Sequence, residues 1–236
     1  MGRTIMGKRT AVIVFLSTLL MLTVCTPKAS RTTRIAGRFT MDAPESVRIM
    51  VGEVLDTIVT VTNDCFEIEI PTVLTRASYL RIGDREIDQI RSQVAFVADG
   101  SDLTYNPESK EIISSDKRGL QTQFAAFNEW VERLEAEYEA KMEEIGDDEA
   151  AADAYTEKVL RKYNRYLLKT AKANRDNVLG AEAISAYEGD DSKAVLAVLR
   201  TFSAEMQAHP DVINMKKNID TASLTEEITS VHVLAS

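Results

Sequence analysis

The chain has 236 residues, of which 44% are hydrophobic, and its formal net charge is −9 at pH 7. This apolar share is enough for a real core in one domain or in two small ones. The excess of acidic residues disfavours nucleic acid and anionic membrane surfaces as partners, because both bind cationic patches.

The first residues have the layout of a secretory signal peptide. Three bases within the first nine residues precede an uncharged stretch of fifteen residues from Ala11 to Cys25. Such a stretch is shorter than the roughly 18–20 apolar residues that a membrane-spanning helix needs. We therefore expect a signal peptide over residues 1–24, with an uncleaved anchor helix as the alternative. Removing it takes away three bases and no acids, which leaves a charge of −12.

The segment Leu22-Thr23-Val24-Cys25 resembles a bacterial lipobox, in which the cysteine is acylated and becomes the first mature residue. It departs from that motif at Val24, where Gly, Ala or Ser is usual. Each buried CH₂ of an acyl chain contributes roughly 0.8 kcal/mol, so several chains would hold the protein on a membrane. We expect residues 25–33 to be the lipidated cysteine and a polar spacer, which leaves Cys65 without an intramolecular partner.

Residues 34–118 have the alternation and turn signals of short β-strands. "RIAGRFTM" places Ile35, Gly37, Phe39 and Met41 on one face, and "TIVTVT" is almost wholly β-branched. "FEIEI" follows Asn63-Asp64, which predicts a hairpin with its turn at 63–65. Further strands are expected at "VRIMV", "SYLRI", "QVAFVA", "DLTYN" and "EII". Six to eight such strands indicate an antiparallel β-sandwich or a barrel-like domain.

The hydrophobic pattern takes on helical spacing after Gly119, and we expect a helical segment over 119–220 and a tail over 221–236. One apolar stripe runs at helical spacing through Leu120, Phe124, Phe127, Val131, Leu134, Tyr138, Met142 and Ile145. Gly146 breaks it, and a second helix is expected over 149–178. Shorter helices are predicted over 179–187, after Asp190-Asp191-Ser192 and from Pro210. The fold class predicted from the whole chain is therefore α+β.

The charges of the two long helices predict how they pair. Residues 129–157 hold twelve acids and two bases, whereas residues 158–175 hold seven bases and no acids. Helices joined by a tight turn lie antiparallel, so the basic half of the second would lie beside the acidic middle of the first. Exposed pairs contribute only about 0–1 kcal/mol each, so they would set register more than stability. Two separately solvated faces are the alternative.

No complete catalytic or metal site is visible, so we assign no catalytic residue, no metal and no cofactor. Neither His209 nor His232 has a motif around it, and the Cys/His clusters of structural zinc are absent. Asp99-Gly100 lacks the ligand spacing of a calcium loop and indicates a turn. Cys65 is expected on the polar face at the hairpin turn. It has no second cysteine at C-x-x-C spacing, which favours an incidental cysteine over a redox one.

An aromatic strip lies along the first helix and includes Phe124, Phe127 and Trp130. One interpretation is that these rings pack the helix against the β-domain and its neighbour. The alternative is a groove that binds a partner.

The order of elements resembles the N-terminal β-domain of a group of exported bacterial lipoproteins, the domain of unknown function 4369. The matching segments are a strand with a glycine, Asp56-Thr57, Asn63 with Phe66, Tyr79 to Asp84, Phe96 with Gly100, and Ala126 to Asn128. They cover about residues 34–130, and the helical region to about 220 is similar in layout only. The resemblance implies a β-sandwich, export and a lipid anchor.

In that family the helical segment usually leads into a thioredoxin-like domain with Cys-x-x-Cys, as in thiol–disulfide oxidoreductases related to peroxiredoxins and to cytochrome maturation. This sequence stops at Ser236, about where that domain would begin. Dithiol exchange needs two positioned sulfurs, and Cys65 cannot supply both. The activity of the family therefore cannot be placed on any residue here.

The sequence leads us to expect an exported, lipid-anchored, non-catalytic docking module in the bacterial envelope that faces the periplasm. We expect it to bind a partner through an exposed β-edge or through the aromatic strip. We favour the outer membrane over the inner one, and a thioredoxin-like envelope protein as the partner. One alternative is a truncated remnant or accessory part of an oxidoreductase. The other is a redox protein that uses Cys65 between molecules.

Overall fold

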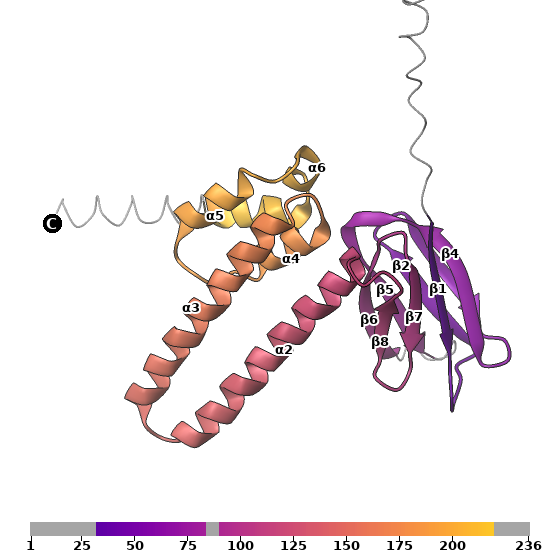
Figure 1. The fold of residues 1–236 in the computed structure, drawn as a ribbon, viewed down its shortest axis with the longest axis horizontal. Coiled ribbons are helices and arrows are strands. Elements are labelled where there is room, and N and C mark those ends of the chain that lie inside the picture. The colour runs from indigo at the N-terminus through magenta and orange to yellow at the C-terminus, as the bar shows by residue number, and fades with distance from the viewer. Residues whose placement is uncertain (1–31, 84–89, 220–236) are drawn as a thin grey trace, which may run out of the picture. The chain divides into compact units, whose positions relative to one another are not determined.

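The computed structural model describes residues 32–83 and 90–219, and these form an α+β protein (Figure 1). The strands come first, between Thr32 and Ser114, and the helices follow from Leu120. Everything described belongs to one compact unit that begins at Thr32. The predicted fold class is therefore confirmed: two mainly antiparallel sheets precede a helical segment built on an antiparallel helix pair.

The first sheet contains four strands, and one of its pairings is parallel. β1 pairs antiparallel with β4 along its whole length and parallel with β7, and β7 forms a hairpin with β8. The parallel pair joins strands that are about 65 residues apart in sequence. In spatial order the strands are β4 (Cys65–Pro71), β1 (Thr32–Arg38), β7 (Asp102–Asn106) and β8 (Glu111–Ser114).

The second sheet is wholly antiparallel. Its central strands are β2 and β5, and β5 is the longest strand of the protein's described part. The pairing of β5 with β6 contains a register shift between Val73 and Ser78, where a bulge enters the ladder. In spatial order the strands are β3 (Leu55–Thr60), β2 (Ser46–Val51), β5 (Val73–Gly83) and β6 (Ile90–Ala98).

The two sheets enclose one apolar core, as period-two alternation requires. In β4 the alternation is as predicted, with Phe66 and Ile70 buried and the two glutamates exposed. In β1 the predicted face continues only to Phe39. Met41 is 82% exposed, because β1 ends at Arg38 and the chain turns away. The largest fully buried side chains of this core are Phe96, Ile35, Ile49, Ile70, Leu80, Leu103 and Val47.

The predicted hairpin of β3 and β4 is wrong. Asn63 and Asp64 do form a tight turn, with φ of 52° and 62°, and a single bridge joins Thr62 to Cys65. Beyond that bridge the strands separate, because β3 pairs with β2 and β4 pairs with β1 in the other sheet. The turn dipeptide therefore connects the two layers of the sandwich instead of two neighbours in one sheet.

The first helix, α2 (Leu120–Ile145), has the predicted bounds. Its stripe is most deeply buried near its start, where Phe124, Phe127 and Leu134 are buried, and only half-buried further along. Gly146 ends the helix with a φ of 62°, a conformation that favours glycine, and its N–H donates to the carbonyl of Met142.

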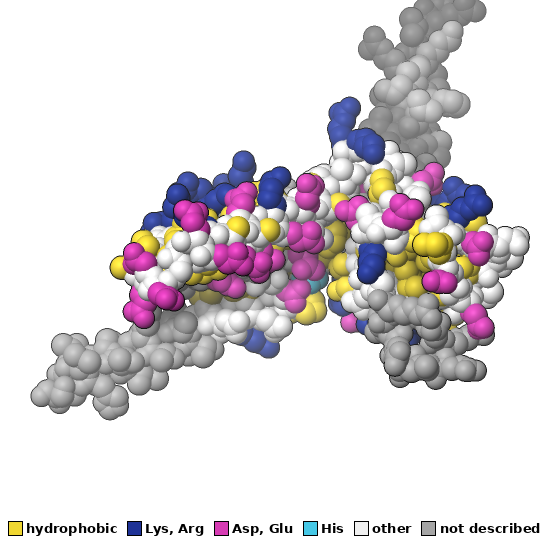
Figure 2. Space-filling model, turned by 90° about the horizontal axis from the view of Figure 1, so that it is seen from below, with side chains coloured by type: hydrophobic (Ala, Val, Ile, Leu, Met, Phe, Trp, Pro, Cys, Tyr) yellow, Lys and Arg dark blue, Asp and Glu magenta, His cyan; other side chains and the backbone are white. Residues whose placement is uncertain are grey.

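The second helix, α3 (Glu149–Ala173), lies antiparallel beside α2 (Figure 1). Asp148 caps it by accepting a hydrogen bond from the N–H of Ala151. The Nζ of Lys162 on α3 lies 3.3 Å from the Oε2 of Glu137 on α2, which is a charge contact between the helices of the kind that the sequence predicts. Figure 2 shows acidic side chains spread along the helical part and basic side chains gathered at its margin.

The remaining helices are short. α3 ends at Ala173, and the predicted helix over 149–178 is therefore too long by about one turn. Asn174 and Asn177 form the connection, and the side chain of Asn177 accepts from the N–H of Leu179. Asp191 caps the helix that the sequence places after it. The following helices are α4 (Val178–Ser185), α5 (Ser192–Leu199), the single turn α6 (Ala204–Gln207) and a helix described over 210–219.

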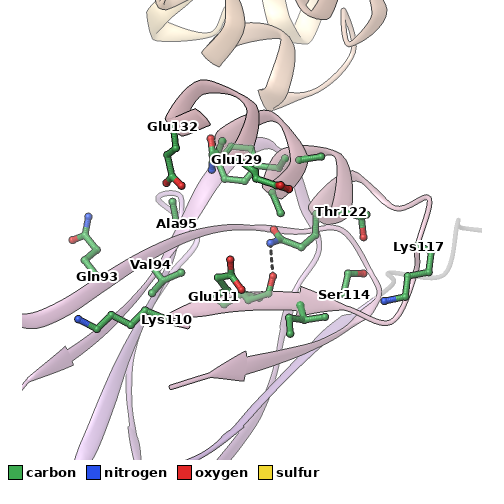
Figure 3. A pocket seen from close by; sticks show the side chains of 17 residues that line it. Gln93, Val94, Ala95, Lys110, Glu111, Ser114, Lys117, Thr122, Glu129 and Glu132 are labelled. Atoms are coloured by element: carbon green, nitrogen blue, oxygen red, sulfur yellow. Dashed lines mark hydrogen bonds between the residues drawn. The ribbon is translucent and has the colours of Figure 1, made fainter. Parts of the chain in front are cut away.

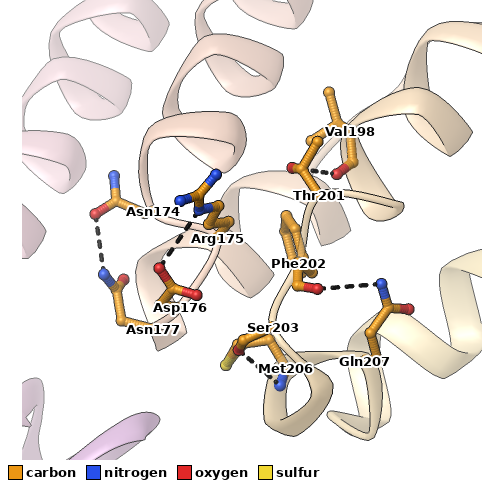
Figure 4. A network of polar contacts seen from close by, with 10 residues as sticks. All are labelled: Asn174, Arg175, Asp176, Asn177, Val198, Thr201, Phe202, Ser203, Met206 and Gln207. Carbon is orange, nitrogen blue, oxygen red and sulfur yellow. Dashed lines mark hydrogen bonds and ion pairs between the residues drawn. The ribbon is translucent and has the colours of Figure 1, made fainter.

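A second apolar core lies among these helices and reaches the outer face of β6 at Val97. Hydrogen bonds connect the short helices: the backbone N–H of Ser203 donates to the carbonyl of Arg175 over 3.1 Å. The side-chain amide of Gln207 donates to the carbonyl of Phe202 over 3.4 Å (Figure 4). α4 crosses the end of α3 so closely that a Cβ on Gly180 would lie 2.2 Å from the carbonyl oxygen of Asn174. Glycine is therefore required at that crossing.

Candidate functional site

The candidate site is a hollow of about 500 Å³ between the edges of the two sheets and the first turns of α2 (Figure 3). β6 is the last strand of one sheet, and β8 is the last strand of the other. Residues 93–95 of β6 form one wall and residues 110–114, which include β8, form the second. α2 forms the third wall through residues between Gln121 and Glu132.

Gln121 closes one end of this hollow and joins the two sheets. Its side chain is 2% exposed and accepts a hydrogen bond from the N–H of Val97 on β6 over 2.7 Å. The same amide donates to the carbonyl of Ile112 on β8 over 2.9 Å. One side chain thus satisfies an edge donor of one sheet and an edge acceptor of the other, both of which would be costly to bury unpaired.

Asp99 fixes the start of α2 from the turn after β6. Its Oδ2 accepts from the backbone N–H of Gln121 over 2.9 Å, and its Oδ1 accepts from the N–H and the hydroxyl of Ser101. The N-cap residue of α2, Gly119, has no side chain, so Asp99 satisfies one of the unpaired first-turn donors from a distance. The carboxylate that suggested a calcium loop is therefore engaged in hydrogen bonds that hold the helix.

The outer edge of β6 is unpaired beyond the Gln121 contact. Side chains from Val94 to Ala98 alternate without a break between the sandwich core and the helical core, so this part of β6 is a regular strand. In a regular strand every second residue presents its N–H and C=O to the same side. Because Val97 points its N–H outward to Gln121, Ala95 and Gln93 also face outward. In the described residues no strand pairs with that edge.

The walls of the hollow carry opposite charges. α2 contributes Glu129 and Glu132, which are exposed and one turn apart, and Figure 3 places both above Ala95. The β8 side contributes Lys110 and Lys117, together with Glu111. Among the residues that the structure describes, none of these five takes part in an ion pair. Small side chains on α2, Ala125 and Ala126, leave room between the charges and the strand edge.

Cys65, the candidate redox residue, is the first residue of β4 and is exposed as a free thiol. It lies opposite Arg38 in the register with β1 and lines a second, shallower hollow of about 500 Å³ with Thr62 and Glu67. The expectation that it lies on the polar face is confirmed. It is separate from the hollow under α2.

The aromatic strip lies against the chain's own helices. Phe124 and Phe127 are 4% and 7% exposed, and both belong to the helical core. Trp130 is half-buried and stacks on Tyr166 of α3, with ring centroids 3.7 Å apart. Phe124 and Phe127 therefore pack the helix, as the first interpretation predicts, and Phe124 also lines the hollow under α2. A role of Phe124, Phe127 and Trp130 in binding a partner stays a prediction.

His209 is half-buried between α6 and the helix over 210–219 and is not part of the hollow. Its side chain is 10% exposed, and its Nδ1 accepts from the backbone N–H of Asp211 over 3.3 Å. Burial is the main cause that lowers its pKa, and Arg76 of β5 acts in the same direction. The carboxylate of Asp211 and the backbone of Thr75 oppose this effect. An Nδ1 that accepts a hydrogen bond belongs to a neutral ring, which agrees with the lowered pKa.

Cys25, the signal peptide over 1–24 and His232 lie outside the described residues, so their assignments stay predictions. Within residues 32–83 and 90–219, no helix has the length and apolar character required to cross a bilayer. The same residues contain no group of three or more His, Cys, Asp or Glu side chains placed to hold a metal ion.

Sequence reasoning missed Gln121, the residue around which the hollow is built. It lies one residue after the first position of the helical stripe, where a polar side chain is expected to face solvent. No protein-family model matches this sequence, and a comparison with curated proteins gives no significant match.

Proposed function

We propose that this chain is a non-catalytic docking module that holds an extended segment of another protein along the free edge of β6. The observation that carries the proposal is the outward-facing backbone of Gln93 and Ala95 at the bottom of the hollow under α2. An unpaired strand edge accepts an added strand through main-chain hydrogen bonds, and a neighbouring hollow receives the alternate side chains.

The geometry limits where such a strand lies. An added strand needs about 4.8 Å from its neighbour. At Val97 the edge is already used by Gln121, whose other end holds β8. The incoming segment therefore pairs with β6 on the N-terminal side of Val97, next to Ala95, and does not insert along the whole gap between the sheets.

The location of the module follows from the sequence. A leader over 1–24 and a lipobox-like Cys25 support export and a lipid anchor, and we favour the outer membrane of a bacterial envelope, facing the periplasm. The resemblance to the domain of unknown function 4369 supports a thioredoxin-like envelope protein as the partner.

Edge pairing can be tested with a labelled ten-residue peptide of alternating valine and threonine that carries two lysines. We expect its binding to slow amide exchange at Gln93 and Ala95. Two further peptides are methylated at every second backbone nitrogen, one at the odd positions and one at the even positions. Only one of these two peptides should lose binding, because only one edge of the peptide faces β6. Ala95→Pro removes the edge donor and should abolish binding while the melting temperature shows that the fold remains. Equal binding of both methylated peptides would contradict edge pairing.

The anchor has its own test. Cells that express the full chain are grown with a radioactive fatty acid, and the chain should be labelled at Cys25. A Cys25→Ala chain that is labelled as strongly as the natural one would remove the anchor from the proposal.

The exposure of Cys65 favours a second candidate function, a redox protein that forms mixed disulfides with a partner. An exposed thiol can exchange with a partner disulfide, although release then requires the partner's second sulfur. Trapping envelope proteins on the natural chain and on a Cys65→Ser chain distinguishes the two functions. Adducts that depend on Cys65 would support the redox role, whereas the docking role predicts none.

A further inference from the structure

We infer that the site under α2 selects extended segments in which basic residues alternate with small or apolar residues. This inference rests on the proposed docking function and names the chemistry of its partner. It comes from the position of Glu129 and Glu132 relative to the edge of β6, and from the two-sided character of any strand that pairs there.

An added strand continues the alternation of the strand on which it pairs. On β6, Ala95 and Val97 face the helical side, whereas Val94 and Phe96 face the sandwich core. Alternate residues of a segment paired beside Ala95 therefore point toward α2, and the residues between them point toward the gap between the sheets. The two sets of side chains enter different surroundings.

The helical side is acidic. Glu129 and Glu132 lie one turn apart on the wall of the hollow and are drawn above Ala95 in Figure 3. Some acids of α2 and α3 are paired, as Glu137 is with Lys162 and Glu157 with Arg161, whereas others are not. Within the described residues Glu129 and Glu132 have no cationic partner, so a lysine or arginine from an incoming strand would supply one.

The opposite side is apolar near the strand edges. Val94 is half-buried beside the sandwich core, and Ile112 of β8 is buried and lines the hollow. Valine or threonine suits such a position, because a charged group there would lose solvent without gaining a partner. Lys110 and Lys117 lie on the β8 side and disfavour bases that point away from α2.

The test compares three peptides that share the alternating valine frame and carry lysine, threonine or glutamate at the positions facing α2. Because it forms two exposed ion pairs, the lysine peptide should bind roughly threefold to tenfold tighter than the threonine peptide at low salt. The glutamate peptide should bind most weakly, and 0.5 M NaCl should remove the differences.

The protein side of the test uses Glu129→Gln/Glu132→Gln, with Glu135→Gln/Glu139→Gln on the same helix as the matched control. The first pair should make the lysine and threonine peptides bind equally, whereas the control should keep the preference. Equal binding of the two peptides to the natural chain, or a preference for the glutamate peptide, would overturn the inference and leave edge pairing intact. If no peptide binds and Ala95 gains no protection, the docking function itself fails.

Discussion

The two ends of the α2–α3 helix pair are built differently. At the base, where the pair meets α4 and the sandwich, Phe127, Leu167 and Ala171 are buried in the helical core. At the tip, near Gly146, the contacts are a stack of Tyr138 on Tyr155 and a hydrogen bond between the hydroxyls of Tyr138 and Thr156. These side chains are half-buried. Burial thus holds the base, whereas the tip depends on weak contacts between half-buried side chains.

The difference shows that one amphipathic stripe does not mean uniform packing. The stripe of α2 continues at the same spacing to Ile145, yet its last buried position is Leu134. The helical core covers the stripe at the base, where this core also includes residues of α4, α5 and β6. The hollow lies at the base as well.

The largest effect is expected from removing a core side chain at the base. Leu167 is fully buried, and Leu167→Ala should lower the free energy of unfolding by about 2–5 kcal/mol, because it leaves a cavity. Leu160 is two turns earlier on α3 and is 36% exposed, so Leu160→Ala should cost less than about 1 kcal/mol. Urea unfolding of the two variants measures the difference. Equal losses would show that base and tip are packed alike.

A smaller effect is expected where the base joins the sandwich. Gln121→Leu leaves the N–H of Val97 and the carbonyl of Ile112 without partners and should cost about 1–3 kcal/mol. Gln123 is exposed on another face of the same turn, and its side chain bonds only to the carbonyl of Arg118, so Gln123→Leu should change stability by about 0.5 kcal/mol or less. Amide exchange should also quicken at Val97 in the first variant alone. An unchanged exchange rate at Val97 would mean that water replaces the hydrogen bonds of Gln121.

The helical core should lose stability on acidification because of His209. The pKa of His209 in the folded protein lies below its unfolded value of about 6.5, so the folded state binds fewer protons. The contribution of neutral His209 to the free energy of unfolding is complete above this unfolded pKa and is lost as the pH falls toward the pKa in the folded protein. Glu182 acts with the opposite sign, because burial and Asp211 raise its pKa and the folded state takes up its proton more readily.

The measurement compares the free energy of unfolding at pH 7.5 and pH 5.5 for the natural chain and for His209→Gln. The natural chain should lose more stability than the variant over this interval. A variant with the same loss would show that His209 does not contribute to the pH dependence.

The smallest effect is expected from the charge contact between the helices. Lys162→Gln removes the pair with Glu137 and should cost less than about 1 kcal/mol, with the loss disappearing in 0.5 M NaCl. Lys169 is exposed on the same helix and forms no ion pair within the described residues, so Lys169→Gln is the control. A double-mutant cycle with Glu137→Gln isolates the pair. A coupling energy that survives high salt would point to burial instead of surface attraction.

The sequence predicted most helices and strands of the fold but not which strands belong to which sheet. The helix from Leu120 to Ile145 and the alternation of β4 follow from local periodicity, which short stretches contain completely. The hairpin at 63–65 was wrong because a turn dipeptide sets the direction of the chain and not the partner of each strand. The prediction that Met41 lies on the buried face of β1 was wrong for a related reason, since the alternation of apolar residues in the sequence continues after the strand has ended.

The candidate site was predicted only in its general nature. An exposed strand edge was one of two surfaces that the docking hypothesis offered. In the other surface, the aromatic strip, Phe124 and Phe127 are buried in the helical core. The sequence did not reveal the edge of β6, because a strand is an edge only when no strand pairs on one of its sides. It did not reveal the role of Gln121 either, because that role depends on the two strands that its side chain joins.

The sequence by itself determined where helices and strands form and which of their faces are apolar, since hydrophobic periodicity and capping are properties of neighbouring residues. The tertiary structure decided that β1 pairs with β7, that Asp99 caps a helix 21 residues away from it, and that one glutamine closes the side of the sandwich. These features join residues that are distant in the chain, and hydrogen-bond satisfaction at a buried edge exists only after the layers have packed.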